Sequence, residues 1–64
     1  MKDVKARIEK LLVDAVDCEI IAKLATNNTK RESFERLAEA YRKMAAELQR
    51  LIDKGQFSED AAKR

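Results

Sequence analysis

Apolar residues recur every three or four positions along two long stretches of the chain, and polar residues fill the positions between them. The clearest stretch runs from about 30 to 54, where an alternating three-and-four spacing links six core positions: Phe34, Leu37, Tyr41, Met44, Leu48 and Leu51. At 100° per residue these positions lie on one side of a helix, with Ala38, Ala45 and Ile52 in a flanking row. The pattern therefore predicts a long amphipathic helix that packs against another helix.

The stretch from about 3 to 25 carries two apolar rows. Its core positions step by three and four from Val4 to Ala25 and include Ile8, Leu11, Ala15, Cys18 and Ala22. A second row lies well around the same helix and consists of Val13, Val16, Ile20 and Leu24. One neighbouring helix covers only one of these rows, so the second row either is exposed or meets another chain. We predict that it forms a dimer interface.

The sequence Thr-Asn-Asn-Thr at 26–29 interrupts both patterns with residues that favour caps and turns, which predicts a short loop and two adjacent antiparallel helices. Two N-caps are open for the second helix: Asn27 alone, or Thr29 in a capping box with Glu32. With a loop centred near residue 28, facing residues have numbers that add up to about 56. Small residues then face large ones near the loop, as in the pairs Ala22 with Phe34, Cys18 with Ala38, and Ala15 with Tyr41.

Gly55, the only glycine, follows the last core positions and is suited to end the second helix in a left-handed conformation. Two interpretations are open for residues 56–64: a short third helix that Ser58 caps and that runs through Ala62, or a frayed tail. The expected fold is therefore all-α, with one antiparallel helical hairpin in residues 1–55 that dimerises into a four-helix bundle.

Composition strengthens the expectation of self-association. At 64 residues the chain hides only about 60% of the surface that its unfolded form exposes, so a single core is marginally stable. One cysteine and no histidine allow neither a disulfide framework nor a metal site. A second copy of the chain is the remaining source of stability, and an unidentified protein partner is a further candidate for the outer surface.

The charges argue against a nucleic-acid surface. Fourteen basic and twelve acidic residues are interspersed along both stretches, and acids lie beside each of the basic candidates Lys30, Arg31, Arg36, Arg42, Lys43 and Arg50. No apolar run approaches the roughly 18 residues of a membrane span, and the N-terminus lacks the pattern of a signal peptide. We expect a cytoplasmic protein.

Two polar or reactive side chains fall on the apolar side of the first helix. Cys18 has neither a histidine to activate it nor a second cysteine, so we interpret it as a small core residue. Glu19 lies near the core positions and needs a partner, for which Lys23 and Tyr41 are the candidates. A lone carboxylate supplies neither a glycosidase pair nor a di-iron site, so we expect no catalytic residues, no cofactor and no enzyme activity.

The two helical patterns together resemble a family of short alphaproteobacterial proteins. The resemblance rests on Ala-x-x-Cys at Ala15 and Cys18, on the turn at 27–28, and on Phe34, Leu37, Ala38 and Tyr41 at fixed offsets, and it covers about half of the chain. The family typically has Asp-Pro where this chain has Asn27 and Asn28, and this chain extends its second helix beyond the family pattern. The resemblance implies a bacterial helical hairpin with Asn27 as the cap, and it implies no activity.

The function that these features favour is a structural or protein-interaction module that acts as a homo-oligomeric helical bundle. The alternative is a regulatory accessory protein that binds nucleic acid or a small ligand on the assembled bundle. A basic stripe shared between two chains would favour the alternative, and mixed charges on every exposed side would favour the interaction module.

Overall fold

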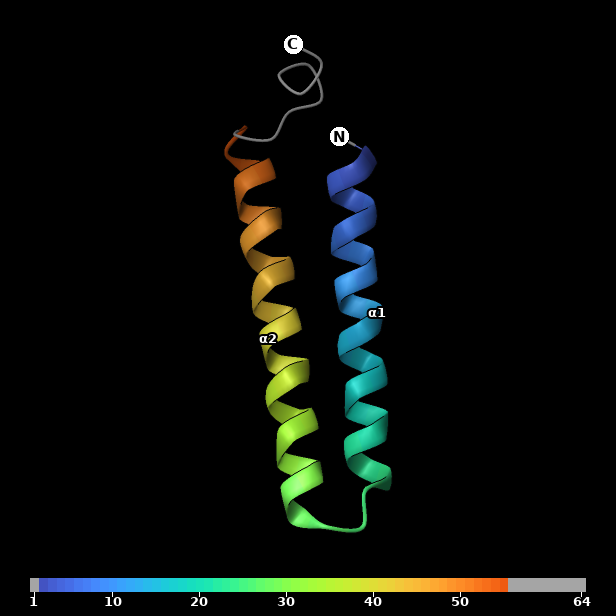
Figure 1. Cartoon of the computed structure of the whole chain (residues 1–64). Coiled ribbons are helices and arrows are strands. Elements are labelled where there is room, and N and C mark those ends of the chain that lie inside the picture. Colours follow the sequence, from blue (N-terminus) through green and yellow to red (C-terminus); the bar gives the residue numbers. More distant parts are fainter. Residues whose placement is uncertain (1, 56–64) are drawn as a thin grey trace.

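The chain forms two antiparallel helices joined by a short loop, as a computed structural model that describes residues 2–55 shows (Figure 1). Helix α1 spans Lys2–Leu24 and helix α2 spans Asn28–Asp53. The all-α hairpin expected from the sequence is confirmed. The helix bounds differ from the expected 3–25 and 30–54 mainly at the start of α2, which begins two residues earlier. Residues 56–64, for which the sequence leaves a short helix and a frayed tail open, lie outside the described residues.

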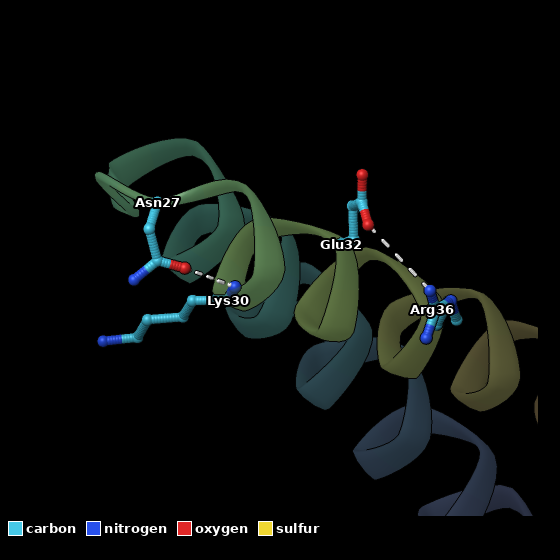
Figure 2. Close-up of polar contacts among 4 residues, drawn as sticks. All are labelled: Asn27, Lys30, Glu32 and Arg36. Carbon is cyan, nitrogen blue, oxygen red and sulfur yellow. Dashed lines mark hydrogen bonds and ion pairs between the residues drawn. The ribbon is translucent and has the colours of Figure 1, made fainter.

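Asn27 is the N-cap of α2. Its backbone is extended, with φ −121° and ψ 154°, and the Lys30 backbone N–H donates to its side-chain oxygen over 2.7 Å (Figure 2). Thr29 lies inside the first turn of α2, and the Glu32 carboxylate lies 4.0 Å from the Arg36 guanidinium one turn further along. Of the two N-caps that the sequence leaves open, Asn27 is therefore the one present in the structure.

Arg31 ties the start of α2 to the end of α1. Its guanidinium donates to the Ala25 carbonyl oxygen over 3.1 Å and to the Asn28 side-chain oxygen over 3.0 Å. The last carbonyls of a helix lack partners within the helix, so a cation that donates to one of them stabilises the helix end. This side chain therefore fixes the turn between the two helices.

Gly55 ends α2 as the sequence predicts. Its φ is +80°, in the left-handed region that favours glycine, and its N–H donates to the Ile52 carbonyl oxygen over 2.9 Å. The preceding residue, Lys54, donates its backbone N–H to the Arg50 carbonyl oxygen over 3.0 Å. The hairpin thus has a defined cap at both ends of α2.

The core lies along the line where the helices meet, and α1 supplies most of it. Its buried residues are Ile8, Leu11, Ala15, Cys18 and Ala22, and Ala25 is buried directly after its end, whereas α2 buries only Ala38 and Ala45. One cluster joins Ile8, Leu11 and Ala45, and a second joins Ala15, Cys18 and Ala38. Tyr41 packs against both clusters and Phe34 against the second, while Val4, Leu48 and Ile52 pack against the first.

Two of the core positions expected in α2 are corrected by the structure. Leu37 and Met44 are 40% and 46% exposed, while Ala38 and Ala45, expected in a flanking row, are buried at 1% and 2%. Leu51, also expected in the core, is half-buried. The alternation of three and four fits both rows, and a row of small residues lets the two backbones approach more closely. The helix is therefore turned so that the alanines face α1.

Candidate interaction surfaces

The second row of α1 is exposed over its whole length. Val13, Val16, Ile20 and Leu24 are 54%, 51%, 50% and 76% exposed. At 100° per residue these four residues lie on the side of α1 opposite its buried residues, and hence on the side away from α2. The structure therefore places this predicted interface where a second chain can reach it.

The two long sides of the hairpin, where α1 and α2 meet, differ in character. One side holds a groove of about 740 Å³ whose walls carry charges of both signs, including Glu19, Lys23, Glu35 and Arg42. The opposite side holds a groove of about 520 Å³ with four apolar or aromatic residues: Leu11, Tyr41, Met44 and Leu48. Charged residues from both helices line the same groove: Arg7, Lys10, Asp14 and Glu47.

A second exposed apolar strip runs along the side of the smaller groove. Met44 lines that groove, and Leu37 lies seven residues earlier, two helical turns along the same side of α2. Asp14 lines the groove from α1, and Ile21 lies seven residues later on the same side. Ile21 is 38% exposed and Leu37 is 40% exposed. We call Ile21, Leu37 and Met44 the side stripe.

Glu19 pairs with a residue that the sequence pattern does not predict. Its carboxylate pairs with the guanidinium of Arg42 on α2, and the two side chains are 41% and 46% exposed. The expected partners, Lys23 and Tyr41, are not the residues that pair with it. Long helical side chains lean toward the N-terminus of their helix, so in an antiparallel pair they converge from positions several residues apart. This direction of the Glu19 side chain is the feature from which Arg42 could have been predicted as its partner.

Cys18 lies in the core. Its side chain is buried, at 7% exposure, in the cluster with Ala15 and Ala38. Among the described residues, no three potential metal-ligating side chains gather in one place, and neither helix is long and apolar enough to cross a membrane. The geometry around Cys18 therefore supports packing, and the exposed apolar rows are the strongest functional feature of the described chain.

The basic residues of α2 are mostly occupied by contacts within the chain. Arg36 and Lys43 lie 4.0 Å and 3.9 Å from Glu32 and Glu39, one turn earlier, and Arg50 pairs with Glu47. Acids and bases therefore alternate along the exposed side of α2 rather than forming a field of one sign.

The sequence does not reveal the side stripe because Leu37 and Met44 fit the core pattern as well as the alanines do. The rotation of α2 decides between the two, and it depends on contacts between the helices.

Comparison of the chain with known protein families, with curated proteins and with solved structures finds no match.

Proposed function

We propose that the protein is a self-assembling protein-interaction module, in which two copies pair through the second row of α1. The observation that carries the proposal is the exposure of the four aliphatic side chains Val13, Val16, Ile20 and Leu24, in one continuous row. Contiguous exposed apolar surface on a soluble helix is typical of an interface.

A second copy is the occupant that this row fits best. A two-fold arrangement brings the row against its own copy and covers both rows at once. Together, the exposed fractions of the four side chains of the second row equal about 2.3 whole side chains per copy, or roughly 3 to 7 kcal/mol of gross burial. Two copies double that gain, which makes it comparable to an association cost of about 4 to 15 kcal/mol.

The distribution of charge also supports an interaction module over the nucleic-acid alternative. Lys10 lies 3.2 Å from Asp14 on α1, and Arg42 pairs with Glu19 between the helices. A nucleic-acid surface needs cations that are free to replace counterions along a phosphate backbone. The second row instead exposes four aliphatic side chains.

The test is the mass of the particle in solution. Sedimentation equilibrium at micromolar concentration should give at least twice the 7.3 kDa of one chain. Ile20→Glu should lower the mass, because it puts a charge into the apolar interface without touching a residue that faces α2. Ala46→Glu is the matched control, since it adds the same charge at an exposed position on the charged groove. A folded 7.3 kDa wild-type chain would refute the proposal.

A further inference from the structure

Pairing through the second row leaves the side stripe uncovered. Ile21 on the stripe and Ile20 in the second row are adjacent in α1 and therefore point about 100° apart. Contact through the second row alone would set the four helices of two chains side by side, with both copies of α1 in the middle. A compact four-helix bundle needs a different face, on which both helices of each hairpin take part.

We infer that a further copy of the chain covers the side stripe, with α1 of each copy packed on α2 of the other. This contact builds on the proposed self-assembly but uses a different surface, so either contact can fail while the other holds. We use height for the position of a residue along the direction of the helices. A two-fold axis parallel to the helices leaves the height of every residue unchanged. Each residue of α1 on this face therefore stands over the α2 residue of the other copy that has the same height.

The apolar residues of the face match in this arrangement. Residues of one chain at equal height have numbers that add up to about 56, as the packing of Leu11 with Ala45 and of Cys18 with Ala38 shows. Ile21 of one copy thus stands over Leu37 of the other. Asp14 stands over Met44, and its charge is met within its own chain by Lys10 at 3.2 Å.

The charges at the rim match as well. Lys10 and Glu47 both line the smaller groove, and Lys10 of one copy stands at the height of Glu47 in the other. Each keeps its partner within its own helix, Asp14 for Lys10 and Arg50 for Glu47, so the contact would join the two pairs into a row of alternating charges. Seven residues earlier in α1 and seven later along the chain, at the C-cap of α2, Asp3 and Lys54 form the next pair with opposite charges. The two-fold axis repeats each pair, so the rim contains four pairs of opposite charge. This complementarity selects a second copy, rather than an unrelated helix, as the partner of the side stripe.

The other two-fold stacking of the same faces is less favourable. An axis across the helices would pack α1 on α1 and α2 on α2, and an axis that passes at the height of Asp14 would bring this residue against its own copy. Like charges facing each other in a contact of low polarity are repulsive. That stacking also sets Met44 opposite its own copy, whereas in the inferred bundle Met44 faces Asp14 of the other copy. The neighbour of Met44 therefore distinguishes the two arrangements.

Disulfide trapping separates the two arrangements. In a Cys18→Ala background, chains with Ile21→Cys are mixed with chains with Leu37→Cys and oxidised with glutathione. The mixed disulfide between the two variants should dominate over either self-linked product. Met44→Cys alone is the control, because in the inferred bundle this residue faces Asp14 of the other copy. Efficient self-linking of Met44→Cys, with no mixed disulfide from the first pair, would overturn the inference.

A charge exchange tests the rim. Lys10→Glu and Glu47→Lys should each weaken association at the side face by about tenfold, since two pairs per contact become repulsive. Mixing the two variants should restore it, because every rim pair in the mixed particle again has opposite charges. Glu39→Lys mixed with Lys43→Glu is the matched control on the exposed side of α2, and it should not change the affinity. Absence of rescue in the mixture would contradict the inferred pairing.

Sedimentation of two interface variants shows which contact fails. With both contacts present, Ile20→Glu and Leu37→Glu should each reduce the particle to a dimer, and the double variant should be monomeric. A wild-type dimer that Ile20→Glu dissociates and Leu37→Glu leaves intact would refute the side contact and keep the second-row contact. The opposite result would keep the side contact and refute the pairing through the second row.

Discussion

Single residues in this hairpin differ in importance according to the side of the helix on which they lie. Leu11 is buried at 8% exposure beside Ala45, whereas Leu37, which the sequence pattern also assigns to the core, is 40% exposed. The pattern of three and four residues identifies the apolar half of each helix, and it does not resolve a rotation of one residue within that half. Contacts between helices set that rotation, which is why Ile8 and Leu11 are predictable and Leu37 is not.

Leu11→Ala should lower the free energy of unfolding by about 2 to 5 kcal/mol, because it leaves a cavity in the core. Leu37→Ala should cost clearly less at concentrations below those at which copies associate, where the side stripe is uncovered. Urea unfolding monitored by circular dichroism, at a concentration at which sedimentation shows single chains, measures both values. Equal losses for the two variants would show that α2 is turned differently from the structure.

The Glu19–Arg42 pair should contribute little to stability despite linking the two helices. Both side chains are more than a third exposed, and exposed pairs are typically worth about 0.2 to 1 kcal/mol. A double-mutant cycle with Glu19→Gln and Arg42→Gln should give a coupling energy in that range, which 0.5 M salt reduces. The Glu39–Lys43 pair within α2 is the control for a contact that does not join the helices. A coupling above about 3 kcal/mol would indicate a buried ion pair instead.

At the scale of the elements, the sequence predicts where the loop lies but does not predict which residue caps the helix after it. Four consecutive cap-forming residues predict its place, and both Asn27 and Thr29 satisfy the local rules for an N-cap. In the structure α2 begins at Asn28, and Arg31 makes a contact across the loop, to the carbonyl of Ala25 directly after α1. A local rule of capping contains no information about that contact.

Asn27→Ala should therefore destabilise the hairpin by about 0.5 to 2 kcal/mol, because the Lys30 N–H loses its acceptor. Thr29→Ala, in the first turn of α2, is the matched control and should change stability by much less. Thermal or urea unfolding of the two variants at equal concentration provides the comparison. A larger loss for Thr29→Ala would reassign the cap and shorten α2 by two residues.

For the molecule as a whole, the two helices differ in the character of their exposed surfaces. Helix α2 has one exposed side rich in charge and exposes apolar residues only on the side stripe, whereas α1 carries exposed apolar residues both in the second row and on the side stripe, in addition to its buried ones. A helix that is apolar on several sides is normally surrounded by other helices. The single hairpin covers α1 on one side only, so assembly is the step that would complete its surroundings.

Stability should accordingly depend on protein concentration. Raising the concentration about a hundredfold should raise the Tm by roughly 5 to 10 °C, since mass action favours a folded assembly over unfolded chains. The Ile20→Glu and Leu37→Glu double variant should lose this dependence, because it removes both apolar contacts and leaves the hairpin core untouched. Melts followed by circular dichroism over that range decide the matter. A wild-type Tm that stays constant with concentration would mean that the hairpin is stable alone and that its exposed apolar rows serve another partner.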